Sequence, residues 1–407
     1  MRYIDFVDLK YKPASTDLIC VFYVEPDGIS VEEAAGAVAA ESSVGTWTEL
    51  STMKDYVEKL HATVFEISGN KMKIAYPMEL FEEANMPNIL SSVAGNIFGM
   101  KALKNLRLND IWLPEKLVRS FRGPAYGIDG IRRILKVQNR PLIGTIIKPK
   151  LGLNTDDHVE VAYDSWVGGC DMVKDDENLA DQNFNKFEAR LLKTLKKRDQ
   201  AEKETGERKM YMVNITTETE EMLRRANLVH ESGGEYAMVD VLTCGYSSLQ
   251  TLRNQDLPLI LHAHRAGHAA FTKNPKHGIS MRVIAKIMRI IGVDQLHVGA
   301  IVGKMSESEE EVLENCAALR DEMFRLKRVL PVASGGVHPL LVPTLIERLG
   351  NDCAIQAGGG IHGHKNGTVE GAKAMRQAVD ATLEGKTLTE YAANHQALQL
   401  ALETWPR

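Results

Sequence analysis

The sequence has few cysteines, and those that it has stand apart from one another. There are five: Cys20, Cys170, Cys244, Cys316 and Cys353. No two of them form a Cys-x-x-Cys pair, the spacing typical of structural zinc sites, and an odd, scattered set does not make a disulfide framework. We therefore expect neither a zinc site nor disulfide bonds.

Long apolar runs and a signal peptide are missing as well. No apolar stretch reaches the roughly 20 residues that a membrane-spanning helix requires, and the first residues, Met1–Phe6, lack the apolar region of a secretory signal. The net charge of −5 comes from mixed signs and gives no basic footprint for nucleic acid. We expect no membrane and no nucleic-acid partner, with the cytoplasm as the default location.

The composition that remains is typical of a soluble globular protein, with 44% of the residues apolar and 25% charged. At 407 residues the chain is too long for one ordinary domain, which suggests two domains or one large barrel with an appendage. The pattern changes after Pro124–Gly127, so we expect a first domain at 1–125 and a second at 126–407.

Strand and helix patterns alternate in the first domain. The expected elements are a strand at 17–25, a helix at 31–40, a hairpin formed by 62–67 and 72–76, a helix at 87–98 and a strand at 103–113. The order β-α-β-β-α-β predicts a ferredoxin-like α+β sandwich.

Short apolar runs alternate with amphipathic helical stretches in the second domain. The eight runs are 142–147, 171–173, 210–215, 236–242, 257–261, 295–298, 329–333 and 353–357. Capping boxes at Thr217–Glu220 and Ser306–Glu309 indicate where two of the intervening helices begin. Eight strand–helix units in about 260 residues predict a TIM (β/α)8 barrel, which makes the fold class α/β.

Charged or glycine-rich residues follow six of the eight runs. They are Lys148–Lys150, Lys174–Glu177, His262–Arg265, His297 with Gly303 and Lys304, Ser334–Gly336, and Gly358–Gly360. In a TIM barrel the chemistry takes place at the C-terminal ends of the strands, where these segments would meet. This placement predicts an active site at that end of the barrel.

The segment after the second run joins one lysine to three acids. Lys174 and Asp176 point the same way on a strand, and Glu177 can turn inward where the strand opens into a loop. Asp176 and Glu177 are oxygen ligands suited to Mg²⁺. Lys174 could pair with the acids as an ammonium, or react with CO2 to give a carbamate, a third oxygen ligand. A solvated acidic strand end is the alternative to a site.

Glycines follow the last two runs. Ser334–Gly336 and Gly358–Gly360 would present backbone N–H groups where barrels hold a phosphate, although glycine clusters also form simple tight turns. Arg265 and His297 could neutralise a second phosphate, so we expect a bisphosphorylated substrate. Lys304 could lie on a mobile lid, or be an exposed lysine without a role.

Histidines and lysines supply candidate acids and bases. We expect one of His262 and His264 to be a packed core residue and the other to act as an acid or base, because no third ligand for zinc stands nearby. Lys148 and Lys150 would crowd Lys174, which lowers the pKa of at least one lysine.

Eight stretches share their order and spacing with one known family. They are Glu41–Thr48, Gly95–Gly99, Gly144–Gly152, Gly169–Asn178, His262–His268, His297–Lys304, Ser334–His338 and Gln356–Gly360. With them the chain resembles, over nearly its whole length, the large chain of ribulose-bisphosphate carboxylase/oxygenase (RuBisCO).

The resemblance implies a role for each catalytic residue. Lys174 is similar to the lysine that CO2 converts to a carbamate, and Asp176 and Glu177 to the other Mg²⁺ ligands. Lys148 resembles the lysine that protonates the final carbanion, and Lys150 its neighbour near the metal. His264 resembles the base, and Lys304 the lid lysine that positions CO2. The implied substrate-binding residues are Arg265, His297, Ser334, Gly335, Gly336, Gln356, Gly358 and Gly359, with Glu41, Thr46, Trp47 and Asn96 supplied by the neighbouring subunit.

The implied reaction needs Mg²⁺ and an activating CO2 on Lys174. Ribulose 1,5-bisphosphate is enolised and carboxylated by CO2, then cleaved to two 3-phosphoglycerates, and O2 competes. The implied partners are these small molecules and a second copy of the chain, in a homodimer or a larger assembly of dimers.

Several departures from the family pattern indicate its archaeal form III branch. Ala300 stands where the family often has threonine, Met305 and Ser306 replace a frequent Leu-Glu, and the chain ends at Arg407 without the long tail of plant-type enzymes. This branch implies no small subunit and a place in AMP and nucleoside ribose salvage.

Two other functions are open from the sequence. A RuBisCO-like enolase or isomerase of a related sugar phosphate would typically replace positions such as Lys304, Glu41 or Asn96, which are all present. A non-catalytic scaffold that binds sugar phosphates would not need Lys174 beside Asp176.

Overall fold

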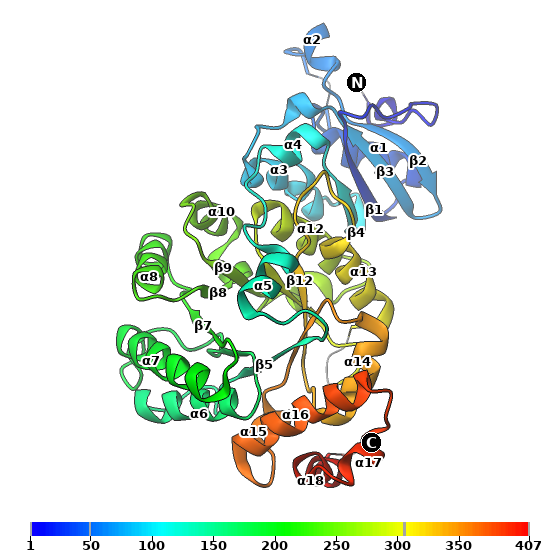
Figure 1. Cartoon of the computed structure of the whole chain (residues 1–407). Coiled ribbons are helices and arrows are strands. Elements are labelled where there is room, and N and C mark those ends of the chain that lie inside the picture. The colour runs from blue at the N-terminus through cyan, green and yellow to red at the C-terminus, as the bar shows by residue number, and fades with distance from the viewer. Residues whose placement is uncertain (1, 49, 304–306, 406–407) are drawn as a thin grey trace. The chain divides into compact units, whose positions relative to one another are not determined.

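The protein is described by a computed structural model that covers residues 2–48, 50–303 and 307–405. Its internal contacts divide the chain into two compact units, each with its own sheet (Figure 1). The first unit comprises Met1–Arg122, Gly267–Ile291 and Met323–Arg325, and the second Gly123–Ala266, Gly292–Glu322 and Leu326–Arg407.

The first unit is built on a sheet with the strand order β10-β4-β1-β3-β2. The strands are β1 (Leu18–Pro26), β2 (Thr63–Ser68), β3 (Lys71–Tyr76), β4 (Leu103–Trp112) and β10 (Gly278–Ile279). β1 pairs antiparallel with β3 and with β4, so the first four strands have the ferredoxin-like order, and the predicted fold is confirmed. The sequence did not predict β10, which adds a short parallel strand beside β4.

Two helices cross between these strands. In α1 (Val31–Glu41) a Cβ on Gly36 would lie 2.0 Å from the backbone oxygen of Tyr3, so only glycine fits this close approach. The single helix predicted at 87–98 is wrong: α3 (Met86–Val93) ends early and Asn96 begins a separate turn, η3 (Asn96–Gly99). Further helical segments of this unit are η1 (Tyr3–Phe6), α2 (Asp55–Glu58), η2 (Met78–Leu80), α4 (Glu115–Arg119), α11 (Ala269–Thr272) and α12 (Met281–Ile291).

The second unit is a closed barrel of eight parallel strands, as predicted. In chain order they are β5 (Leu142–Ile146), β6 (Met172–Lys174), β7 (Met210–Asn214), β8 (Tyr236–Asp240), β9 (Ile260–His264), β11 (Gln295–Gly299), β12 (Leu330–Ser334) and β13 (Ala354–Gln356). The fifth strand was predicted at 257–261 and lies three residues later. Pro258 has no N–H to give to a ladder, so pairing starts after it, and His264 is on the strand.

Helices follow the barrel strands in turn. They are α5 (Gly127–Leu135), α6 (Thr155–Val167), α7 (Phe187–Thr205), α8 (Thr219–Glu231), α9 (Val241–Cys244), α10 (Tyr246–Asn254), α13 (Glu309–Arg320), η4 (Pro339–Leu341), α14 (Val342–Leu349), α15 (Gly359–His362), α16 (Gly367–Leu383), α17 (Leu388–Ala392) and α18 (Gln396–Thr404). Both predicted capping boxes are wrong in register. Glu218 caps α8, and the box of α13 is formed by Ser308 and Glu311, while Ser306 lies outside the described residues. No helix in the described ranges is long and apolar enough to cross a membrane.

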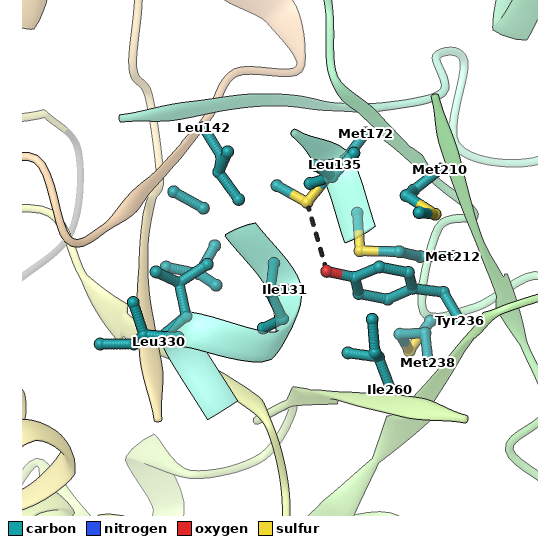
Figure 2. Packing of buried hydrophobic residues seen from close by; sticks show 13 residues of the cluster. Ile131, Leu135, Leu142, Met172, Met210, Met212, Tyr236, Met238, Ile260 and Leu330 are labelled. Carbon is teal, nitrogen blue, oxygen red and sulfur yellow. Dashed lines mark hydrogen bonds between the residues drawn. The ribbon is translucent and has the colours of Figure 1, made fainter. Parts of the chain in front are cut away.

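The barrel interior is filled by apolar side chains of alternate strand residues, rich in methionine (Figure 2). The members on the strands are Leu142, Met172, Met210, Met212, Tyr236, Met238, Ile260, Leu330, Val332 and Ala354. Because side chains two apart on a strand share a face, the next inward residue of each strand lies at the C-terminal mouth of the barrel.

Candidate active site

The inward-facing strand ends bring polar side chains together at the mouth of the barrel. Each follows, two residues later, a member of the apolar interior. They are Lys174 after Met172, Asn214 after Met212, Asp240 after Met238, Ser334 after Val332 and Gln356 after Ala354. His264 reaches the same level on β9. The barrel therefore places a lysine, a histidine and carboxylates around one space.

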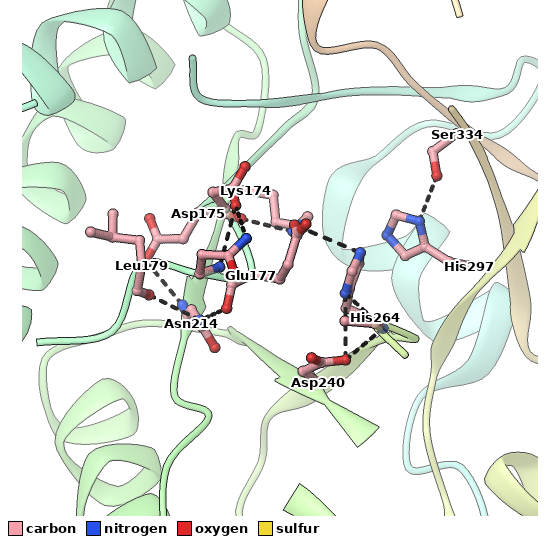
Figure 3. A network of polar contacts seen from close by, with 12 residues as sticks. Lys174, Asp175, Glu177, Leu179, Asn214, Asp240, His264, His297 and Ser334 are labelled. Atoms are coloured by element: carbon pink, nitrogen blue, oxygen red, sulfur yellow. Dashed lines mark hydrogen bonds and ion pairs between the residues drawn. The ribbon is translucent and has the colours of Figure 1, made fainter. Parts of the chain in front are cut away.

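Lys174 is fully buried and lies beside carboxylates (Figure 3). Its Nζ donates to the backbone oxygen of Asp175 (2.8 Å) and lies 3.7 Å from Glu177 Oε2. Burial lowers the pKa of the Lys174 amine, and it outweighs the neighbouring carboxylates, which raise it. A buried amine with a lowered pKa is the nucleophile that reaction with CO2 requires.

Asp176 and Glu177 can supply oxygen ligands next to this amine. Asp176 accepts a hydrogen bond from Lys148 Nζ at 2.7 Å. Burial alone would raise the pKa of Asp176, but hydrogen bonds from Lys148 and Asn178 hold it below its usual value, so the carboxylate is ionised. Among the described residues no group of three or more His, Cys, Asp or Glu side chains could hold a metal ion. Two carboxylates and a carbamylated Lys174 would fit Mg²⁺, since the lysine then provides the third anionic oxygen ligand.

Asp175 points away from the mouth and anchors the end of β6. Its carboxylate accepts from Arg190 Nε (3.1 Å), from the Tyr211 hydroxyl (2.6 Å) and from the backbone N–H of Asn214 (3.0 Å), and it lies 3.2 Å from His158 Nε2. Burial would raise the pKa of Asp175, but Arg190, His158 and Tyr211 lower it well below the usual range. The sequence interpretation gave Asp175 no role, although alternation along the strand already turns it outward.

Asn214 and Asp240 are two further mouth residues that the sequence interpretation missed. Asn214 Nδ2 donates to the backbone oxygens of Glu177 (3.0 Å) and Leu179 (2.9 Å), which holds the loop after β6. Asp240 Oδ1 lies 3.5 Å from His264 Nδ1, whose other ring nitrogen lies 3.7 Å from Glu177 (Figure 3). Both residues end the observed strands β7 and β8, and each is a polar residue inside a predicted apolar run (210–215 and 236–242), which is the signal that could have identified them.

The glycine loops follow β12 and β13 as predicted. Gly335 and Gly336 have φ angles of +116° and +77°, a conformation that side chains disfavour. At Gly358 a Cβ would come within 3.1 Å of Lys148 Cε, and Gly359 begins α15. Gln356 is buried, and both polar atoms of its side-chain amide lack a hydrogen-bond partner within the described part of the chain. Backbone and amide groups of this kind suit an oxygen-rich ligand.

Arg265 is already paired. Its Nη2 donates to Glu307 at 2.6 Å, its side chain is almost fully buried, and burial lowers the pKa of the guanidinium. A phosphate that binds Arg265 Nη2 would have to displace Glu307, whereas the buried Nη1 has no hydrogen-bond partner among the described residues. Lys304, the predicted lid lysine, lies outside the described residues, and Lys150 is exposed in the loop after β5.

We expect Glu307→Gln to strengthen anion binding at the mouth. The substitution removes the charge that occupies Arg265, so the affinity for inorganic phosphate should rise about tenfold, as measured by calorimetric titration. Glu309→Gln is the matched control, because Glu309 pairs with the half-exposed Arg348 on the outside of the barrel. An unchanged affinity in Glu307→Gln would show that Arg265 does not bind the anion.

The residues predicted to act from a neighbouring subunit all lie in the first unit. Glu41 ends α1 and accepts a hydrogen bond from the Tyr3 hydroxyl (2.9 Å). Thr46 is half-buried, Trp47 is 81% exposed, and Asn96 begins η3 and is exposed. Their roles stay predictions.

Comparison with known proteins agrees with this geometry. The model of the ribulose bisphosphate carboxylase large chain, catalytic domain, matches residues 127–405, and that of the N-terminal domain matches residues 5–117. A ribulose bisphosphate carboxylase from Methanocaldococcus jannaschii is 50% identical, over 98% of this chain and 100% of the relative, and one from Pyrococcus furiosus is 51% identical over 99% and 97%.

Solved structures show the same likeness. An octameric RuBisCO from Pyrococcus horikoshii OT3 has a TM-score of 0.96 at 48% identity, with 99% of this chain and 97% of the other covered. A dimeric archaeal RuBisCO from Hyperthermus butylicus has a TM-score of 0.92 at 46% identity, with 99% of each covered. The predicted family and the enzyme class in its name are confirmed: this chain belongs to the family of ribulose bisphosphate carboxylase large chains.

Proposed function

We propose that the protein is a ribulose-1,5-bisphosphate carboxylase/oxygenase of the archaeal form III type. The observation that carries the proposal is the buried Lys174 amine, with its lowered pKa, next to Asp176 and Glu177 at the barrel mouth. Relatives about half identical over nearly the full chain are named for carboxylation of this substrate.

Lys174, Asp176 and Glu177 are the residues that would hold Mg²⁺. The neutral amine of Lys174 attacks CO2, forms a C–N bond and releases one proton, which leaves an anionic carbamate. Mg²⁺ bound there would supply a Lewis acid that polarises the substrate carbonyl.

The other mouth residues have separate tasks in this proposal. His264, whose Nε2 lies 3.7 Å from Glu177, would accept a proton from the substrate. Lys148, whose Nζ lies 2.7 Å from Asp176, would return a proton to the carbanion left by cleavage. The N–H groups of the loops after β12 and β13 would bind phosphate.

The assembly and the pathway are parts of the same proposal. We infer a homodimer or an assembly of dimers without a small subunit, since similar archaeal structures are described as dimeric and octameric. A particle mass equal to one chain would contradict this. A role in the salvage of ribose from AMP and from nucleosides is part of this proposal, and it rests on the resemblance to the archaeal form III branch.

A labelling assay tests the function. Protein supplied with Mg²⁺, ribulose bisphosphate and labelled CO2 should place acid-stable label in 3-phosphoglycerate, and removal of Mg²⁺ by a chelator should stop it. Consumption of the bisphosphate without label would instead indicate an enolase or isomerase. Binding without turnover would indicate a scaffold.

A further inference from the structure

Five side chains form one continuous hydrogen-bonded chain from the barrel interior to the mouth. Gln295 Nε2 donates to the Tyr236 hydroxyl (3.0 Å), and Gln295 Oε1 lies 2.7 Å from His262 Nδ1. The two histidines meet through their Nε2 atoms at 2.9 Å, and His297 Nδ1 lies 2.6 Å from Ser334 Oγ, as Figure 3 shows for the last link. Tyr236, His262 and Gln295 are fully buried, and His297 is 4% exposed.

Both histidines in the chain are neutral. Burial lowers the pKa of His262 to about 3 and that of His297 well below its usual value. A neutral imidazole has one N–H donor and one acceptor nitrogen. The hydrogen bonds must therefore all run in the same direction, because a reversed link would set two donors or two acceptors against each other at less than 3 Å.

The groups around Gln295, at the inner end of the hydrogen-bonded chain, determine in which direction its hydrogen bonds are donated. Gln295 Nε2 has two hydrogens, and the Tyr236 oxygen at 3.0 Å and Met172 Sδ at 3.5 Å can accept them. The Tyr236 hydroxyl in turn points to the same sulfur at 3.9 Å (Figure 2). A thioether accepts but cannot donate, so a rotated amide would set its oxygen against the sulfur and lose these contacts. The amide oxygen of Gln295 thus faces His262.

The orientation of the Gln295 amide fixes which atom donates at each of the following links. Gln295 Oε1 accepts from His262 Nδ1–H, which leaves His262 Nε2 to accept from His297 Nε2–H. His297 Nδ1 is left as an acceptor, and the Ser334 hydroxyl donates to it. The hydrogen of Ser334 is turned into the barrel, and the remaining lone pair of its oxygen faces the mouth.

We propose that Gln295 is a positioning residue that, through His262 and His297, holds Ser334 as a hydrogen-bond acceptor at the mouth. Ser334 Oγ then accepts a hydrogen bond from a hydroxyl of the substrate and does not donate one to a phosphate oxygen. The glycine N–H groups alone would donate to the phosphate. The statement about substrate rests on the proposed function, whereas the direction of the chain does not.

Nitrogen spectra of histidine test the direction without any turnover. In protein labelled with ¹⁵N-histidine, with signals assigned by comparison with His262→Asn, the shifts report which ring nitrogens carry a proton. We expect Nδ1–H on His262 and Nε2–H on His297, unchanged between about pH 6 and pH 8, where free histidine titrates. Gln295→Leu should give a mixture of both tautomers on both rings. Met212→Leu, in the same interior cluster but outside the chain, should leave them unchanged.

Kinetics test the consequence for the substrate. Gln295→Leu should raise KM for ribulose bisphosphate about tenfold and change kcat by less than about threefold, because the contact through Ser334 is the same in the bound substrate and the transition state. The opposite tautomers or an imidazolium would overturn the direction, and a Gln295→Leu protein with wild-type tautomers would overturn the positioning role of Gln295. Changed tautomers with an unchanged KM would overturn the role of Ser334. A wild-type protein that fixes no carbon would refute the proposed function alone, since the spectra stand without it.

Discussion

Lys174→Met is expected to abolish Mg²⁺-dependent carboxylation while the protein stays folded. Methionine fills the buried volume of the lysine but has no amine to react with CO2, so two carboxylates remain where the proposed Mg²⁺ site has three anionic oxygen ligands. Folding should not suffer. Burial lowers the pKa of Lys174, so at neutral pH the unfolded chain binds the ammonium proton more tightly than the folded protein does. Burying Lys174 therefore costs the wild type free energy of folding, and the methionine variant does not have this cost. The melting temperature should equal or exceed that of the wild type.

Two measurements separate this result from a general defect. Label from CO2, trapped covalently on the protein in the presence of Mg²⁺, should be found on the wild type and not on Lys174→Met. Lys209→Met is the matched control: Lys209 is equally buried, but it pairs with Glu207 and the backbone oxygen of Cys170 where β7 begins, away from the mouth. It should retain labelling. Carboxylation of ribulose bisphosphate by the Lys174→Met protein would show that a carbamate on Lys174 is not required for the reaction.

Asp175→Asn should lower the free energy of unfolding by about 3–5 kcal/mol, because Arg190 is left as a buried charge without its carboxylate. Chemical unfolding in urea at neutral pH measures the difference. Asp156→Asn is the matched control, because its ion pair with Lys193 is exposed and should be worth less than about 1 kcal/mol.

The difference between Asp175→Asn and the wild type should also depend on pH. The pKa of Asp175 is lowered in the folded protein, so its stabilisation is present above the pKa of the unfolded chain, about 3.9, and is lost as the pH falls towards the folded value. The difference should be constant from about pH 6 to 8 and shrink below about pH 4. A loss no larger than that of Asp156→Asn would show that the Arg190 pair does not anchor β6.

Much of the fold could be predicted because the strand ends combine two signals. An apolar run that stops at a charge, as Met172 and Val173 do before Lys174, defines both a buried strand and the mouth residue that follows it. The 4-1-3-2 order in the first unit likewise follows from the order of elements. The boundaries of the elements were predicted less well. Because of Pro258, β9 begins three residues later than predicted, and α8 is capped by Glu218 and not by Thr217.

The supporting contacts of the site could not be predicted, because they join residues far apart in sequence. Asp175, directly after β6, meets Arg190 on α7 only in the folded barrel, and Arg265 meets Glu307 from a different loop of the barrel. Sequence spacing says nothing about such pairs. The same holds for Gln295, whose amide is informative only once Tyr236, Met172 and His262 surround it.

The first unit takes part of its sheet from far along the chain. β10 and α12, at 278–291, complete a structure whose other strands end at Trp112. During synthesis on the ribosome the outer edge of β4 is therefore unpaired until all of β5 to β9 has emerged, and an unpaired strand edge promotes association with other chains. The first unit is thus completed only after part of the second has been synthesised. An N-terminal fragment that ends near residue 125 would lack β10, and the edge of β4 would stay unpaired.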